Sequence, residues 1–312
     1  MIQETVPDSI QKVHALRDRL NSALVGKADV VEMVIACVLA RGHLLFDDLP
    51  GLGKTTLAKA LAESIGGQFS RVQCTPDLLP TDISGFNIYN QKAHEFEFRK
   101  GPVFADLLLA DEINRATPRT QSALFEAMAE RQVTIDNQTL PLASTFLVIA
   151  TQNPIESHGA YPLPEAQLDR FAVTLSIGYP SKQDEVQMLA EKVGESRQVV
   201  DESPVITIDE LQFVQELVNN IEVNEMVRGY LVDLGTATRE HSELEIGLSP
   251  RGLITWQKMA QAWAFLQNRK FVTPDDIQKV ARPVLKLRIS GKTQNSDRII
   301  DEVISSVKVP GE

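Results

Sequence analysis

A glycine-containing loop, Asp-Leu-Pro-Gly-Leu-Gly-Lys-Thr-Thr at residues 48–56, constrains the fold of this chain more than any other feature. It follows an apolar run at 43–46 and leads into a helical pattern at 57–62, so the sequence predicts a strand, a loop and a helix. Such a loop points backbone N–H groups inward, and the helix N-terminus adds the positive end of its dipole. Lys54 can then reach the terminal phosphates of a nucleotide, and the Thr55 hydroxyl can ligate Mg²⁺. The unit therefore predicts a nucleoside triphosphate site.

The loop departs from the usual pattern at its first position, which is normally glycine and is Asp48 here. Aspartate tolerates turn conformations better than most residues. Its negative charge would repel bound phosphates, so we expect the Asp48 carboxylate to point away from the nucleotide.

Length, charge and composition narrow the class of protein. A chain of 312 residues is long enough for two domains. Its formal net charge of −11 argues against a nucleic-acid partner, because duplex binding relies on Lys and Arg side chains that neutralise phosphates. No run of about 18 apolar residues is present, and residues 1–5 do not resemble the start of a secretory signal. We therefore expect a cytoplasmic protein without an integral membrane segment.

The cysteines and histidines do not indicate a disulfide or a metal centre. The two cysteines, Cys37 and Cys74, lie far apart in the sequence, and we expect both to be reduced thiols. The five histidines have no metal-ligand spacing with one another or with the cysteines. A metal site built from histidine or cysteine is therefore not expected.

Apolar strand patterns alternate with helical patterns in the first part of the chain. Residues 103–110 and 145–150 have the apolar composition of buried strands, and residues 121–130 between them have helical periodicity. Strands that are apolar on both faces and are separated by helices indicate a parallel sheet covered by helices on both sides. The sequence thus predicts an α/β nucleotide-binding domain over residues 1–179.

Two segments interrupt that alternation. Residues 131–142 alternate and carry Asp-Asn near their centre, which predicts a β-hairpin. Residues 85–100 carry aromatic side chains and a strict alternation near their end, which predicts an insertion with a hairpin arm. From residue 180 to residue 312 the pattern is mostly helical, so we expect a second, smaller, all-helical domain there.

The apolar run at 107–110 ends in two carboxylates, Asp111 and Glu112. Asp111 could hold Mg²⁺ through water, and Glu112 could polarise the water that attacks the γ-phosphate. An acidic pair after an apolar run also arises by chance. Its distance along the chain from Lys54 is, however, close to the spacing of neighbouring elements in P-loop sheets, which favours Mg²⁺-dependent hydrolysis.

Three further polar residues complete a candidate site. Asn153 follows the apolar pattern at 145–150, and at the end of a neighbouring parallel strand it could hold the water or the γ-phosphate. It also precedes Pro154, and Asn-Pro is a common turn. Arg170 and Arg251 would each pass for a surface residue, but an arginine supplied by a neighbouring subunit accelerates hydrolysis by about 10³–10⁵-fold. Such an arginine would make activity depend on oligomerisation.

Five segments, in order, resemble the MoxR family of AAA+ ATPases over nearly the whole chain. They are the loop at 48–56, Leu-Leu-Ala-Asp-Glu-Ile-Asn-Arg-Ala (108–116), Ala-Thr-Gln-Asn-Pro (150–154), Tyr-Pro-Leu-Pro-Glu-Ala-Gln-Leu-Asp-Arg-Phe (161–171) and Leu-Ser-Pro-Arg-Gly (248–252). The second and fourth contain the motifs most specific to this family. The resemblance implies an AAA+ P-loop NTPase domain with a parallel sheet covered by helices, followed by a smaller C-terminal all-helical lid domain.

The resemblance also implies a role for each candidate residue. Lys54 and Thr55 match the Walker A site, Asp111 and Glu112 Walker B, Asn153 sensor 1, Arg170 the arginine finger and Arg251 sensor 2. The implied nucleotide-binding residues are Val25, Gly26, Pro50, Gly51, Leu52, Gly53, Lys54, Thr55 and Thr56, and the implied Mg²⁺ ligands are Thr55 and Asp111. The segments at 85–100 and 131–142 match the helix-2 and pre-sensor-1 inserts of this clade. Arg115 is a further candidate to reach across a subunit interface.

Members of this family form hexameric rings and act as chaperone-like remodelling ATPases. The resemblance therefore implies ATP and Mg²⁺ as cofactors, a homo-oligomeric ring, a partner with a von Willebrand factor A domain, and a protein client. Three alternatives stay open: the motor subunit of a metal-chelatase-like complex, a DNA-stimulated ATPase, and a nucleotide-gated scaffold that hardly hydrolyses. The acidic composition argues against the DNA motor, and the intact Glu112, Asn153 and Arg170 argue against the scaffold.

Overall fold

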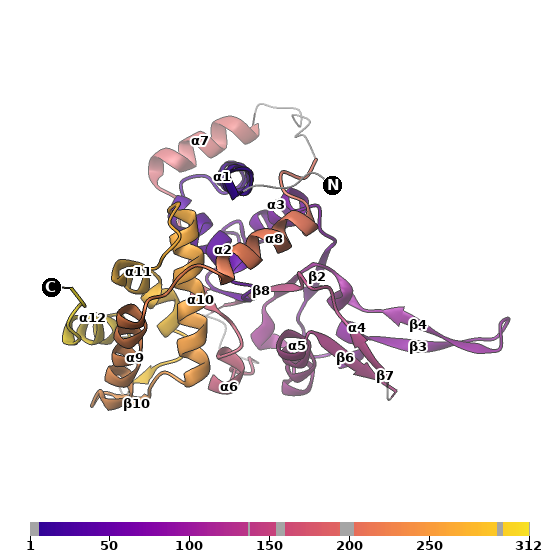
Figure 1. Ribbon diagram of the computed structural model, residues 1–312. Helices are drawn as coiled ribbons and strands as arrows, with labels where there is room; N and C mark the ends of the chain where they lie inside the picture. The colour runs from indigo at the N-terminus through magenta and orange to yellow at the C-terminus, as the bar shows by residue number, and fades with distance from the viewer. Residues whose placement is uncertain (1–5, 137, 154–159, 194–202, 292–295, 312) are drawn as a thin grey trace.

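A five-stranded parallel sheet lies at the centre of the first domain, with strand order β2-β5-β8-β1-β9 (Figure 1). The computed structural model describes residues 6–136, 138–153, 160–193, 203–291 and 296–311. The strands of the sheet are β1 (Leu44–Asp47), β2 (Phe69–Gln73), β5 (Leu107–Asp111), β8 (Leu147–Gln152) and β9 (Val173–Leu175). Because all five run the same way, the residues that follow β1, β5 and β8 meet at one edge of the sheet.

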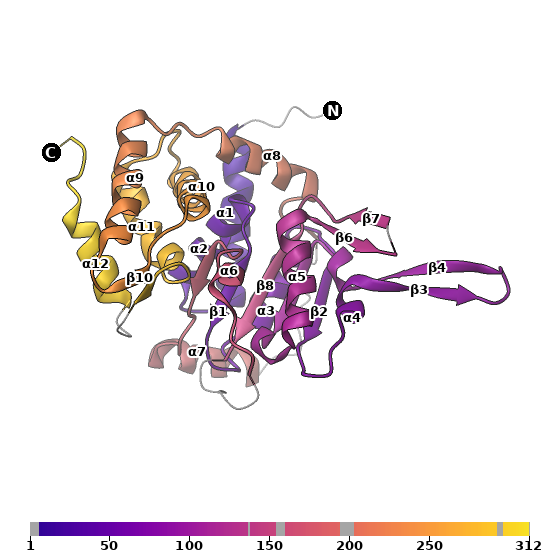
Figure 2. The same ribbon diagram turned by 90° about the horizontal axis from the view of Figure 1, so that it is seen from below.

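Helices cover both faces of this sheet, as the sequence predicts. Leu107 and Leu109 of β5 pack in the same core as α1 (Val6–Ala23), α2 (Ala28–Leu39) and α3 (Lys54–Ser64). Leu108 and Ala110 point the other way, into a second core with α4 (Pro80–Ser84) and α5 (Pro118–Glu130). Figure 2 shows α5 in front of the sheet and α1 behind it. The side-chain alternation of a strand buried on both faces thus builds two cores, and the predicted α/β architecture is confirmed.

Both predicted hairpins are present. Strands β3 (Gly85–Asn90) and β4 (Glu95–Lys100) pair antiparallel and project far from the body of the protein (Figure 1). Strands β6 (Gln132–Ile135) and β7 (Gln138–Pro141) form the second, shorter hairpin. On the first hairpin, Tyr89 and Phe96 form an edge-to-face pair with ring centroids 5.3 Å apart, yet Phe96 remains 71% exposed. The long hairpin therefore carries aromatic side chains into solvent.

The described residues of the C-terminal region are mostly helical, with one short pair of strands and an isolated β-bridge between Glu222 and Phe271. Its helices are α9 (Glu225–Glu240), α10 (Pro250–Leu266), α11 (Pro274–Leu285) and α12 (Ser296–Ser306), and its antiparallel strands are β10 (Leu244–Ile246) and β11 (Ser290–Gly291). Trp256 of α10 is fully buried, and its indole N–H donates 2.8 Å to the carbonyl of Ile277 in α11. Capping boxes at Thr207 and Thr273 begin two of the helices in this half of the chain, α8 (Ile208–Asn219) and α11.

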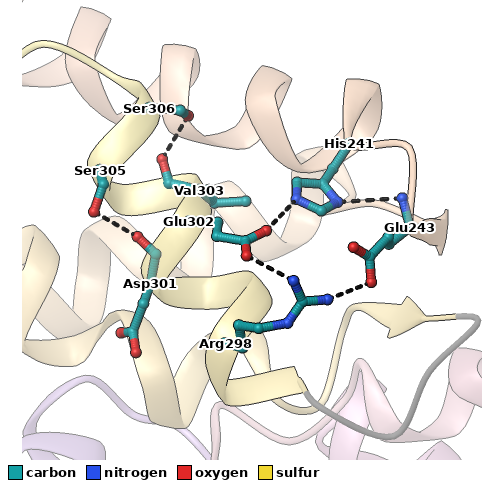
Figure 3. A network of polar contacts seen from close by, with 8 residues as sticks. All are labelled: His241, Glu243, Arg298, Asp301, Glu302, Val303, Ser305 and Ser306. Carbon is teal, nitrogen blue, oxygen red and sulfur yellow. Dashed lines mark hydrogen bonds and ion pairs between the residues drawn. The ribbon is translucent and has the colours of Figure 1, made fainter.

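A polar network joins the end of α9 to α12 on the surface of this region (Figure 3). Arg298 contacts Glu302 at 2.8 Å and Glu243 at 2.5 Å, and the His241 ring lies 3.3 Å from the Glu302 carboxylate. These side chains are partly exposed, so solvent screens the ion pairs and each contributes little to stability.

Two helices of the C-terminal half lie against the first domain or its binding site. Helix α8 (Ile208–Asn219) packs on α2, and its Gln215 amide donates 2.8 Å to the Val38 carbonyl. Helix α7 (Lys182–Val193) contributes to the cavity described below. The division at residues 179 and 180 therefore stays a prediction.

One strand begins later than the sequence predicts. The expected strand at 103–110 begins later, at Leu107, because Pro102–Phe104 forms a 3-10 turn, η1. Proline fixes φ and suits the first turn of a helix, which accounts for the difference. The other short elements are η2 (Ile113–Arg115) and α6 (Glu165–Leu168). Among the described residues both cysteines are free and buried, and no helix is long and apolar enough to cross a membrane.

His43, directly before β1, makes folding stability depend on pH. Its Nδ1 accepts the Val148 N–H at 3.0 Å and its Nε2 lies 3.1 Å from the Met128 carbonyl, so the neutral ring is satisfied. Burial lowers the pKa of His43 from 6.5 to about 4. The unfolded chain therefore takes up a proton below pH 6.5 that the folded chain takes up only near pH 4, and stability falls as pH falls through this window.

We expect the titration of His43 to lower the free energy of unfolding by about 3 kcal/mol as the pH falls from 6.5 to 4. Urea unfolding across this range, for the wild type and His43→Asn, measures the contribution. The variant starts less stable because it loses one buried hydrogen bond, but its stability declines less steeply. An identical pH slope in both proteins would contradict the assignment.

Candidate functional site

A cavity of about 830 Å³ opens at the edge of the sheet where β1, β5 and β8 end. The loop between β1 and α3 lines it, together with the end of α1, the strand β2, the residues after β5 and β8, and one side of α7. Parallel sheets of this kind bind ligands at the carboxyl ends of their strands, so this cavity is the candidate site.

The loop adopts the conformation that phosphate binding requires. Gly51 and Gly53 have φ of +85° and +93°, which favours glycine, and Gly53 is the N-cap of α3. Lys54, the first residue of α3, is 8% exposed. Its ammonium donates 2.8 Å to the carbonyl of Asp48 and 2.9 Å to that of Leu49. The ammonium therefore rests on the loop backbone at the place where phosphates would bind.

Burial lowers the pKa of Lys54, and the charge of Asp48 followed by that of Asp111 opposes the shift. The acidic surroundings thus help to keep this ammonium charged in a confined site. A charged ammonium is the form that binds phosphate.

The Asp48 carboxylate points away from the loop interior, as expected from its charge. It accepts hydrogen bonds from the backbone N–H of Ile177, the N–H of Gly178 at 3.3 Å and the Ser176 hydroxyl at 3.1 Å. Those three residues follow β9 and lead towards α7. The aspartate therefore ties the start of the phosphate loop to the segment between the two halves of the chain.

Asp48→Gly restores the glycine that usually begins such loops, yet we expect it to destabilise the protein. The change leaves the buried N–H of Ile177 without its acceptor, which costs about 1–3 kcal/mol. Urea unfolding measures the loss. Asp233→Asn, at an exposed position of α9, serves as the control and is expected to change stability by less than about 0.5 kcal/mol. A fully stable Asp48→Gly protein would show that these hydrogen bonds contribute nothing.

The two carboxylates after β5 lie in the same cavity and have separate partners. Asp111 pairs with the Arg71 guanidinium at 2.7 Å and accepts from the Thr151 hydroxyl at 3.3 Å. Glu112 accepts from the Gln73 amide at 3.0 Å and from Arg115 at 2.9 Å. The two side chains thus have different partners, and the Thr151 hydroxyl joins their surroundings because it also accepts the Glu112 backbone N–H at 2.9 Å.

The backbone of Glu112 is in the left-handed region, with φ of 55°. A non-glycine residue adopts this conformation at some cost, and such strain concentrates at functional sites. It occurs here at the residue that the sequence indicates as the one to polarise water.

The donor set at this edge fits Mg²⁺. Thr55 and Asp111 both line the cavity and offer a hydroxyl and a carboxylate, the hard oxygen ligands that Mg²⁺ prefers. Mg²⁺ in nucleotide sites takes one or two protein ligands and completes its shell with phosphate oxygens and water. A site with two protein oxygens beside a phosphate loop therefore matches the ion, whereas no cluster of three histidine, cysteine or acidic ligands occurs in the described ranges.

Of the other predicted residues, some line the cavity and some do not. Asn153 does, directly after β8, as does Val25, two residues after the end of α1. Gly26 adjoins Val25 with φ of +73°, and a Cβ there would collide with the Asp184 carboxylate of α7. The structure thus brings Lys54 together with both carboxylates and Asn153, while their catalytic roles stay predictions.

Neither Arg170 nor Arg251 lines this cavity. Arg170 donates 2.8 Å to the carbonyl of Phe125 in α5, and Arg251 is exposed in the first turn of α10. Arg115 bonds Glu112 of its own chain, so this structure does not direct it towards a neighbouring subunit.

Several cavity residues were not found from the sequence. Arg71 and Gln73 come from the edge strand β2, and Met188 and Leu189 come from α7. Alternation in β2 places Arg71 and Gln73 on one face, but nothing along the chain connects that face to Asp111 and Glu112. The apolar residues of α7 have the periodicity of an ordinary helix, so they gave no signal of a binding site.

Comparisons with known proteins agree with this geometry. Residues 43–173 match the model of the ATPase family associated with various cellular activities (AAA), and residues 236–306 match the AAA lid domain. The uncharacterized protein YeaC of Bacillus subtilis is 46% identical, with 94% of this chain and 93% of that protein covered. Chaperone MoxR1 of Mycobacterium tuberculosis is 39% identical, with coverage of 92% and 77%. A crystal structure from Cytophaga hutchinsonii, described as that of a candidate ATPase, has a TM-score of 0.89 at 34% identity, covering 97% of this chain and 96% of its own.

Proposed function

This chain belongs to the MoxR family of AAA+ ATPases, and from that premise we propose that it is a Mg²⁺-dependent ring ATPase that remodels or matures a protein client. It is an ATP hydrolase with the AAA domain and lid of that superfamily. The ring, the metal and the client are the proposed part.

The proposal rests on which of the candidate residues lie in the cavity and which lie outside it. Lys54, Asp111, Glu112 and Asn153 share one cavity, whereas Arg170 and Arg251 lie outside it. A phosphoryl-transfer site needs a positive charge opposite the loop to stabilise the transition state. A second copy of the chain, with its arginines facing this cavity, would supply that charge. Arg71 also lines the cavity, but its guanidinium is paired with Asp111 at 2.7 Å. We therefore propose that the site is complete only in an assembly.

Within the cavity, each residue of the chain has a defined task. Lys54 and the N–H groups at the start of α3 hold the β- and γ-phosphates. Glu112 accepts a proton from the attacking water, and Asn153 orients that water against the γ-phosphate. Thr55 and Asp111 would hold Mg²⁺, which when bound neutralises charge on the phosphate oxygens.

The remodelling role and the partner rest on the family. The Mycobacterium tuberculosis relative carries the name chaperone, which supports a protein client for this chain. A von Willebrand factor A domain protein is the proposed partner. The long β3–β4 hairpin, with its exposed Phe96 and Tyr89, is the proposed contact surface for the client or the partner. The acidic chain, with net charge −11, does not favour DNA as the substrate.

Mass measurement of the Glu112→Gln variant with ATP and Mg²⁺ tests the assembly. The variant is expected to bind nucleotide without consuming it, so a ring that ATP stabilises should accumulate as a hexamer. A monomer at all protein concentrations would overturn the proposal. Wild-type turnover with and without duplex DNA tests the alternative motor, and a several-fold stimulation by DNA would favour it.

A further inference from the structure

Asp169, the residue before Arg170, connects the loop of the proposed arginine finger to the C-terminal domain. Its carboxylate forms an ion pair with Arg288 at 2.8 Å and accepts from the Ser249 hydroxyl at 3.3 Å. Arg288 follows α11, and Ser249 precedes α10. One carboxylate therefore holds two separate segments of the C-terminal domain.

The Arg288 side chain also bonds to the backbone of the same loop. Its guanidinium donates to the carbonyl of Phe171 at 2.5 Å and to that of Ala172 at 3.0 Å. It also donates 2.9 Å to the Val284 carbonyl in the preceding helix, α11. Arg288 is only 7% exposed. A planar guanidinium that is buried and bonded on several sides has one allowed position, so it fixes the groups around it.

Ser249 links the same carboxylate to Arg251. Its hydroxyl accepts the N–H of Gly252 at 3.0 Å and so caps the N-terminus of α10, where Arg251 is the second residue. Burial lowers the pKa of Arg288 and the Asp169 carboxylate opposes that shift, while the positive charge of nearby Arg251 adds a smaller lowering effect. The two arginines that lie outside the cavity thus flank one polar cluster, in which Arg288 is buried and Asp169 and Ser249 are partly buried.

We propose that Asp169, Arg288 and Ser249 form a positioning clamp that holds Arg170 and Arg251 as one unit for the nucleotide of a neighbouring subunit. The inference rests on the proposed function, in which both arginines act on the neighbour. None of the three clamp residues lines the cavity of its own chain. A movement of the C-terminal domain would therefore also move the loop that carries Arg170. That movement would control ATP hydrolysis in the neighbouring subunit.

The test uses Arg288→Met in the full chain. We expect turnover per subunit to fall by about 10²-fold, because a displacement of about 1 Å costs that much. The dissociation constant for ATP and the assembled mass should change less than twofold. Arg298→Met is the matched control: Arg298 also pairs with carboxylates of the C-terminal domain, but at the surface (Figure 3), and its loss should leave turnover unchanged.

Mixing Arg288→Met with Glu112→Gln distinguishes a positioning role of Arg288 from a purely structural one. A Glu112→Gln subunit has intact arginines, and an Arg288→Met subunit has intact carboxylates. In a mixed ring the first can serve the second, so two nearly inactive proteins should recover activity together. Arg170→Ala mixed with Glu112→Gln is measured in parallel as the reference for rescue.

Each outcome decides between the two proposals. Rescue of both variants supports the clamp. Normal turnover of Arg288→Met, or rescue of Arg170→Ala without rescue of Arg288→Met, overturns the clamp and leaves the proposed function standing. Failure to rescue Arg170→Ala overturns the proposed function, and the clamp falls with it. If Arg288→Met does not fold, Asp169→Asn decides, because it keeps the side-chain shape; a smaller loss with rescue supports the clamp, and wild-type turnover overturns it.

Discussion

Arg170→Ala is expected to lower ATP turnover of the assembled protein by about 10³–10⁵-fold, while ATP affinity and assembly are retained. The guanidinium lies outside the cavity of its own chain, so its loss leaves that chain's phosphate loop intact. The developing charge on the neighbour's γ-phosphate would, however, lose its stabilising partner. Turnover at saturating ATP, nucleotide affinity and mass are the three quantities to measure.

The local hydrogen bond of Arg170 calls for a control. The guanidinium donates 2.8 Å to the Phe125 carbonyl, and losing this bond is expected to cost only about 1 kcal/mol of stability. Arg170→Lys keeps the charge and loses the planar fork, so its turnover should lie between those of the wild type and Arg170→Ala. If Arg170→Ala hydrolyses ATP normally, the finger is another residue.

Glu112→Gln is expected to lower turnover by about 10²–10⁴-fold, because a general base contributes that much, and to leave ATP binding unchanged. Glutamine has the same size and can still accept from the Gln73 amide, so the site should keep its shape. Turnover is measured beside equilibrium binding of a fluorescent ATP analogue.

The exposed Glu126 of α5 provides a matched control, and Glu126→Gln should hydrolyse ATP at the wild-type rate. Retained turnover in Glu112→Gln would remove this residue from the chemistry. Loss of binding together with turnover would instead assign Glu112 a role in holding the nucleotide.

The core of the fold was predictable because its signals are local. The Gly-Lys-Thr loop indicates a strand before it and a helix after it, and an apolar run such as 107–110 indicates a strand of a sheet that is covered on both faces. Parallel strands bring their carboxyl ends to one edge, which is why Lys54, Asp111 and Asn153 could be expected to meet.

The rest of the site depends on contacts between segments that are far apart in the sequence. Arg71 pairs with Asp111 only because β2 lies beside β5, and no local pattern reports that neighbour. Asp48 was expected to point away from the nucleotide, but its bonds to Ile177 and Gly178 depend on where β9 ends. The pairing of Asp169 with Arg288, across more than a hundred residues, was equally hidden.

The most direct test of the trans-acting ring is steady-state ATP turnover per subunit, measured across protein concentrations with mass recorded in the same samples. If each cavity requires the arginines of a neighbour, turnover per subunit should be close to zero for the monomer and should rise in parallel with the assembled fraction. Turnover per subunit that stays constant from monomer to assembly would show that one chain contains the whole catalytic site, and would contradict the account.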